Sequence, residues 1–186
     1  MKWRFAAKFS LTFATLSVLW WAVDAPARYR SAALATTQLV SPIVNGWWLD
    51  YDQPGMSEPV MYRSGETRLP MLLQLPALSM GLMPLLSLIV ATPGLGVRRT
   101  AITAALGIVL YFLVDVVVVL SYPIIMNHPN ALKDTLGVFT GLLAFAVAPL
   151  GLWFVLTYPV LRSLWHITPE SEQPALTKLK RSRARG

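Results

Sequence analysis

A long apolar run with one acidic residue constrains this chain more than any other feature. The run extends from Thr100 to Leu120 and, apart from Asp115, stays uncharged as far as about Met126. Arg98 and Arg99 stand at its entrance. As a helix that rises about 1.5 Å per residue, the run is long enough to cross a bilayer. Asp115 then lies at or beyond the middle of the membrane, where a carboxylate costs roughly 2.5 to 3.5 kcal/mol. The run therefore predicts a membrane helix that carries one expensive side chain.

The composition indicates the same class. Only 13% of the 186 residues are charged and 55% are hydrophobic, whereas soluble domains carry about 25% charged residues. The chain has no cysteine, which excludes disulfides, thiolate catalysis and cysteine metal sites. We expect one helical membrane unit, with little chain left for a second domain.

Four apolar segments predict four transmembrane helices. The first belongs to an N-terminal anchor of residues 1–24, and the others are expected at about 77–92, 100–126 and 136–161 within a membrane region of residues 70–165. Pro84 is expected to kink the second helix, and Pro123 to end the third, because proline lacks the N–H that an interior helical position needs.

The first segment also has a competing interpretation. Ala25-Pro26-Ala27 resembles the cleavage site of a signal peptide. We favour a retained anchor, because proline separates the two alanines and the segment closes with Trp20 and Trp21, which suit a membrane interface.

Residues 25–69 form the one extended polar region and predict a small α+β cap outside the membrane. Apolar residues at helical spacing predict an amphipathic helix from about Arg28 to Asn45 that stops at Gly46. The stretch Trp47 to Asp52 alternates like a strand, with Trp47, Leu49 and Tyr51 on one face. Val60–Arg63 and Thr67–Leu69 flank a turn and predict a hairpin. We expect the aromatic faces to form the cap's own core or its lipid contact.

The basic residues predict the orientation. With the N-terminus inside, eleven basic residues lie in the cytoplasm and five lie outside, as the positive-inside rule requires. The inner group includes the topology determinants Arg98, Arg99, Arg162, Lys178, Lys180 and Arg181. The expected fold is an all-α membrane protein of the bacterial inner membrane, with four transmembrane helices and both termini cytoplasmic. Residues 166–186 form a basic cytoplasmic tail, which the topology explains and to which contact with anionic lipid is a modest addition. Nucleic acid is not an expected partner, because no aromatic residues interleave the basic run.

Asp115 is the candidate intramembrane functional or docking residue. An acid inside a membrane suggests a proton relay, an ion site or a partner for a basic group. No basic residue lies at comparable depth in the other predicted spans. Asp115 is therefore either neutral and hydrogen bonded, to Ser79, Ser87, Thr140 or a backbone carbonyl, or paired with a basic residue of another protein.

Enzymatic parts are missing from the sequence. His128 and His166 fall on opposite sides of the predicted membrane, so they cannot share a metal or a proton relay. We expect no cofactor and no metal site. An enzyme of unknown type stays open only through four acids of the cap, which are Asp50, Asp52, Glu58 and Glu66.

The chain from Leu78 to Gly94, followed by Arg98-Arg99, the long apolar span and the segment Lys133 to Gly137, shows a recognisable pattern. It resembles the C-terminal half of the exosortase and archaeosortase family of membrane-embedded sorting transpeptidases. At the positions of the family's nucleophilic Cys, Asn, catalytic Arg and His, this chain has Leu78, Asp115, Val118 and Lys133. The resemblance implies a related architecture without the catalytic chemistry.

Together these observations predict a non-enzymatic inner-membrane protein that assists an exosortase-type envelope protein-sorting system. Its expected contact surfaces are the cap, from Trp47 to Leu69, and the face of Asp115, which would pair with a basic residue of another membrane protein. The alternative is a small proton- or ion-coupled transporter subunit in which Asp115 titrates within an oligomer.

Overall fold

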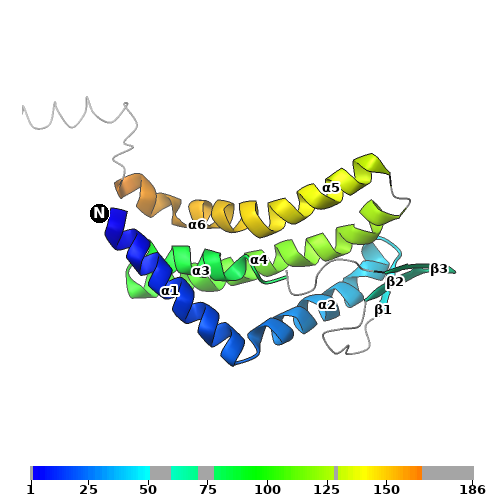
Figure 1. Cartoon of the computed structure of the whole chain (residues 1–186), viewed down its shortest axis with the longest axis horizontal. Helices are drawn as coiled ribbons and strands as arrows, with labels where there is room; N and C mark the ends of the chain where they lie inside the picture. Colours follow the sequence, from blue (N-terminus) through cyan, green and yellow to red (C-terminus); the bar gives the residue numbers. More distant parts are fainter. Residues whose placement is uncertain (1, 51–59, 71–77, 128–129, 165–186) are drawn as a thin grey trace, which may run out of the picture.

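The computed structural model describes residues 2–50, 60–70, 78–127 and 130–164. In chain order, its elements are the helices α1 and α2, a three-stranded sheet, and the helices α3, α4, α5 and α6 (Figure 1). Their bounds are α1 Lys2–Ala22, α2 Ala25–Val44, β1 Trp48–Asp50, β2 Met61–Ser64, β3 Thr67–Pro70, α3 Leu82–Ala91, α4 Val97–Met126, α5 Ala131–Leu142 and α6 Ala148–Leu164, with the π-helical turn η2 Leu143–Val147 between the last two. Helix α4 is central, because α2, α3, α5 and α6 all pack against it.

Among the described residues, three helical segments are long and apolar enough to cross a membrane. They are Phe5–Ala22 in α1, Val97–Met126 in α4 and Val138–Arg162, which runs through α5, η2 and α6. Much of their surface consists of exposed large apolar side chains, among them Leu11, Leu19, Leu106, Val109, Leu150 and Val155. A lipid environment accommodates such a surface and water does not. The prediction of a membrane protein agrees with this arrangement.

The second predicted transmembrane helix is shorter than expected. Helix α3 begins at Leu82 rather than near residue 77, because residues 78–81 form a turn in which Ser79 has a φ of +89°. Its ten residues rise about 15 Å, half the thickness of a hydrocarbon core. Pro84 does not kink α3, because it lies in the first turn, where its missing N–H would have no helical partner.

Helix α4 and the run from α5 to α6 accommodate their interior prolines in different ways. Helix α4 ends at Met126, as expected for the third span at 100–126, but Pro123 does not end it and lies inside the helix. The N–H of Asn127 donates to the Pro123 carbonyl over 2.9 Å. The fourth predicted span, 136–161, is a longer helical run in which η2 precedes Pro149. A π-helical turn before a proline changes the helical register and is a recognised site of helix bending.

The predicted cap is present as α2 and an antiparallel sheet of order β1-β2-β3. Helix α2 begins three residues earlier than predicted, at Ala25, after Asp24 takes a left-handed conformation. The predicted hairpin is confirmed, with Ser64 paired to Thr67. Gly65, with a φ of +58°, takes the first central turn position, where a positive φ suits glycine. The alternation also holds in its described part: Trp47 and Leu49 are buried, whereas Trp48 is 64% exposed.

Two apolar cores hold the molecule together. One joins the cap to the C-terminal half of α4 and contains Leu34, Trp47, Leu49, Val60, Tyr62, Leu78, Val119 and Tyr122. The other joins α3 to α4, with α1 and α6 around it, and contains Leu82, Met83, Leu85, Ile89 and Tyr111. Because α4 contributes to both cores, its position determines how the cap sits relative to the other helices.

Gly81, which precedes α3, provides a test of the second core. A Cβ atom there would overlap the hydroxyl of Tyr111 and approach Cγ of Pro149 to 2.6 Å. We expect Gly81→Ala to lower the stability of the purified protein by about 1–3 kcal/mol, the range for an overpacked core. Thermal unfolding in detergent, followed by circular dichroism, measures the loss.

The matched control is Gly151→Ala in α6. Nothing lies within 4 Å of a Cβ atom at Gly151, so alanine should leave the melting temperature unchanged or raise it, because alanine is the better helix former. An equal loss in both variants would contradict the steric explanation.

Candidate functional site

Asp115 lies inside the molecule, on the side of α4 that faces α2. The side chain is completely buried, with 0% exposure. The hydroxyl of Tyr29 on α2 donates a hydrogen bond to its Oδ2 over 2.7 Å. Ser87 and Thr140, two donors suggested by the sequence, instead donate to backbone carbonyls of their own helices. The acid therefore connects α4 to the first helix of the cap.

Aromatic rings enclose this hydrogen bond. The Tyr29 ring meets the ring of Trp20 from α1 at 6.1 Å between centroids, and that of Phe112 from α4 at 5.6 Å, both edge to face. One turn before Asp115, the hydroxyl of Tyr111 accepts the N–H of Gly81 over 3.2 Å. Three helices thus supply a low-polarity surrounding in which the Tyr29–Asp115 hydrogen bond is strengthened.

The second carboxyl oxygen, Oδ1, is buried without a hydrogen-bond partner among the described residues. No basic side chain in that part of the chain forms an ion pair with Asp115. A buried carboxylate needs a counter-charge or several donors, so this environment suits a neutral carboxyl group. The carboxyl is also out of reach of another protein while α2 stays in place.

A second set of polar contacts attaches the cap to the other half of α4. Pro123 has no N–H, so the Val119 carbonyl, four residues earlier, loses its helical partner. The hydroxyl of Tyr62 on β2 donates to that carbonyl over 2.5 Å. The next carbonyl, that of Leu120, accepts the side-chain amide of Asn45 over 2.9 Å. The cap therefore donates to two consecutive carbonyls of α4, of which Val119 is the one that lacks its helical partner.

Asn45 also organises the junction between α2 and β1. Its Oδ1 accepts the N–H of Trp47 and the hydroxyl of Ser41, each over 3.0 Å. The Ser41 hydroxyl can instead donate to the Trp47 carbonyl oxygen, which lies 2.7 Å from Oγ. One amide side chain thus links the end of α2, the start of the sheet and α4.

Burial raises the pKa of the Tyr62 hydroxyl, and the neighbouring Tyr122 raises it further. Tyr62 consequently stays protonated at neutral pH and remains a donor to Val119. Tyr122 itself donates to the Pro70 carbonyl at the end of β3 over 3.3 Å, and its ring stacks on that of Tyr62 at 6.2 Å. The sequence analysis did not single out these tyrosines. The available signal was Pro123 inside an apolar helix, which implies an unsatisfied carbonyl.

Two of the four acids of the cap, Asp50 and Glu66, belong to the described residues. Asp50 forms an ion pair with Arg63 of the adjacent strand, and Glu66 lies in the turn between β2 and β3. Asp52 and Glu58 lie outside the described residues. Within residues 2–50, 60–70, 78–127 and 130–164, no group of three His, Cys, Asp or Glu side chains is placed to hold a metal ion.

The three described topology determinants lie at one end of the molecule. Arg98 and Arg99 are exposed in the first turn of α4, and Arg162 is exposed near the end of α6. The start of α1 lies at this same end, opposite the sheet (Figure 1). Lys178, Lys180 and Arg181 lie outside the described residues, as do His128 and His166.

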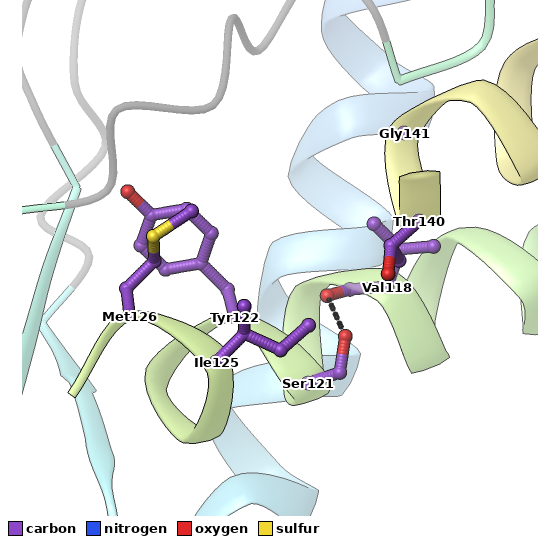
Figure 2. A pocket seen from close by; sticks show the side chains of 7 residues that line it. All are labelled: Val118, Ser121, Tyr122, Ile125, Met126, Thr140 and Gly141. Atoms are coloured by element: carbon purple, nitrogen blue, oxygen red, sulfur yellow. Dashed lines mark hydrogen bonds between the residues drawn. The ribbon is translucent and has the colours of Figure 1, made fainter. Parts of the chain in front are cut away.

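A small hollow of about 50 Å³ separates α4 from the α5 side of the bundle (Figure 2). Its three hydroxyl groups are already engaged. Ser121 donates to the Val118 carbonyl (Figure 2) and Thr140 to the Leu136 carbonyl, each over 2.8 Å, and Tyr122 donates to the Pro70 carbonyl. The lining side chains Tyr122, Ile125 and Met126 are large and mostly apolar. The hollow is thus a packing gap and offers no free group for chemistry.

Comparison of the chain with protein-family models, with curated proteins and with solved structures finds no match.

The attachment of Tyr62 to α4 can be tested with a double-mutant cycle. Tyr62→Phe leaves the Val119 carbonyl buried without a donor, and we expect it to cost about 1–3 kcal/mol of stability. In a Pro123→Ala background, the restored backbone N–H at position 123 can donate to Val119, so the same change should cost less. Chemical or thermal unfolding of the four proteins in detergent gives the coupling.

Tyr158→Phe, at a half-exposed position on α6, is the control for loss of a hydroxyl. It should leave the unfolding midpoint unchanged. If Tyr62→Phe costs the same with and without Pro123, the proline does not create the acceptor site.

Proposed function

We propose that this chain is a non-enzymatic, multi-pass protein of the bacterial inner membrane that serves as an accessory component of an exosortase-type protein-sorting system. One observation carries the proposal: the cap is fixed to α4 through Tyr62, Asn45 and Tyr29. A small domain held in one orientation on a membrane helix is well suited to present a surface to another protein.

The choice of sorting system rests on the sequence resemblance from Leu78 onward. At three catalytic positions of the exosortase family, this chain has Leu78, Val118 and Lys133. Leu78 supplies no nucleophile and Val118 no charge, so the amine of Lys133, which could exchange a proton, has no thiol to activate. We therefore assign the chain a role beside an active sorting enzyme.

The proposed topology has four crossings and both termini in the cytoplasm. Helices α1, α4 and the α5–α6 run supply three crossings, and α3 forms part of the fourth. Two observations support this orientation: the exposed Arg98, Arg99 and Arg162 share one end of the molecule, and the cap occupies the other (Figure 1). The positive-inside rule assigns the basic end to the cytoplasm.

The length of α4 supports a depth for Asp115. Thirty residues rise about 45 Å, which exceeds a hydrocarbon core of about 30 Å. The segment before Asp115 is mostly exposed, whereas Val116, Val118, Val119, Tyr122 and Pro123 after it are buried against protein. Asp115 lies about 27 Å from Val97 along the helix axis. We therefore place it near the outer boundary of the membrane rather than at its middle.

Trp48 is the side chain that we assign to partner contact. It is 64% exposed on β1, while its neighbours Trp47 and Leu49 point into the core. Exposed tryptophan is unusual on a free protein surface and is enriched among the residues that dominate binding energy in interfaces. The buried Asp115 contributes indirectly in this proposal, by holding α2 and with it the cap.

The test is affinity purification of the tagged protein from native membranes in mild detergent, with the exosortase-type enzyme detected by mass spectrometry. We expect wild type to recover that enzyme. With Trp48→Ala, the amount of enzyme recovered should fall by roughly tenfold or more, as for an interface hot spot. Asp115→Leu should also reduce recovery, because it removes the acceptor for Tyr29.

The control is Trp3→Ala, since Trp3 is an 89% exposed tryptophan at the opposite end of the molecule. It should behave like wild type. Recovery of a homogeneous self-oligomer without the sorting enzyme, or equal losses for the two tryptophan variants, would count against the accessory role.

The orphaned Oδ1 of Asp115 favours a second candidate function, a proton-coupled subunit. An acid without a counter-charge can take up and release a proton, which an amide cannot do. In proteoliposomes under a membrane potential, Asp115→Asn should then abolish proton uptake while partner recovery persists, because the amide oxygen still accepts from Tyr29. Equal uptake by wild type and Asp115→Asn would eliminate this function.

A further inference from the structure

An open groove of about 350 Å³ lies at the basic end of the molecule, between the start of α4 and the end of α6. It is separate from the Asp115 environment and from the cap, and neither proposed function uses it. Its walls are mainly apolar, with one arginine among them. The lining includes Leu95, Arg99, Ile102, Thr103, Leu156 and Val160.

Two features at the groove favour an anion. The Arg99 side chain is exposed, as is that of the adjacent Arg98. Both belong to the first turn of α4, where backbone N–H groups have no helical acceptors and the helix dipole is positive. Gly96 caps this turn and has no side chain to satisfy those groups. The Arg99 guanidinium and the helix N-terminus therefore adjoin this cavity, and Arg98 precedes Arg99 in the same turn.

The walls indicate that the anion carries an apolar chain. Ile102 is 59% exposed and lies on the groove, and Leu106, one turn further along α4, is 46% exposed. The apolar surface thus continues from the groove along the membrane helix, away from the arginines. A free phosphate would use only the basic end of this arrangement, whereas a phospholipid would use all of it.

We propose that the groove binds one anionic phospholipid, with its phosphate at Arg99 and the start of α4 and an acyl chain along Ile102 and Leu156. The negative charge of bacterial membrane lipids complements the arginines. This inference goes beyond the proposed function, because it requires no partner protein and holds for either candidate function.

The test is native mass spectrometry of the full chain, purified in detergent and titrated with dioleoyl phosphatidylglycerol or dioleoyl phosphatidylcholine. We expect one phosphatidylglycerol to bind about fivefold or more tightly than phosphatidylcholine, the factor typical of one basic residue at a membrane surface. Arg99→Gln should remove the preference. Arg68→Gln, at an exposed arginine on β3 of the opposite end, should retain it.

A second variant tests the acyl chain without changing charge. Thr103→Phe places a ring in the groove and should weaken phosphatidylglycerol binding, while chain-free glycerol phosphate should not compete at matched concentration. Equal effects of Arg99→Gln and Arg68→Gln, or full competition by glycerol phosphate, would overturn the proposal. Recovery of the sorting enzyme is a separate measurement, so the two proposals can fail independently.

Discussion

The structure depends on the backbone of α4 near Pro123. A proline inside a membrane helix leaves a carbonyl without its N–H donor, and in a low-polarity environment that carbonyl must find another. Here the donor comes from the cap, through the buried hydroxyl of Tyr62, and Asn45 donates a second hydrogen bond to the neighbouring carbonyl of Leu120. The feature that should have ended the helix instead fixes a domain to it. The position of the sheet relative to the membrane helices follows from these two hydrogen bonds and the apolar core around them.

Asp115 has the same relation to α2 that Val119 has to β2. Each is an acceptor on α4 that would be costly if left alone, and each receives a tyrosine hydroxyl from the cap. The two contacts are one helical turn apart on α4, yet they reach both ends of the cap region, Tyr29 near its start and Tyr62 in its sheet. Because the donors are neutral hydroxyls, attachment does not require an ionised partner. The carboxyl group is thus one of two acceptors on α4 that attach the cap to this helix. Its Oδ1 has no hydrogen-bond partner among the described residues.

Much of this fold was predictable from local patterns. Apolar length predicted α1 and α4, helical spacing predicted α2, and the residues around Gly65 predicted the hairpin. The predictions failed where a long-range contact decides the outcome. Pro123 was expected to end α4 because sequence position does not reveal that Tyr62 will satisfy Val119. Asp115 was recognised as unusual, but Tyr29 is 86 residues away and was read only as one apolar position of an amphipathic helix. Pro84 was expected to kink a span because hydropathy cannot show that α3 begins only two residues before it.

The two ends of α4 obey different physical requirements. At the cap end, side chains satisfy backbone carbonyls and buried apolar residues exclude both lipid and water. At the basic end, the first turn has a glycine cap, exposed arginines and an open groove. An anion stabilises a helix N-terminus whose N–H groups have no acceptor, and an anionic lipid headgroup can provide that anion. Substitutions at Trp48 and at Arg99 act on these separate regions without shared contacts, so their effects on the free energy of unfolding should be additive. Measured non-additivity would mean that the lipid groove and the cap communicate through α4 itself.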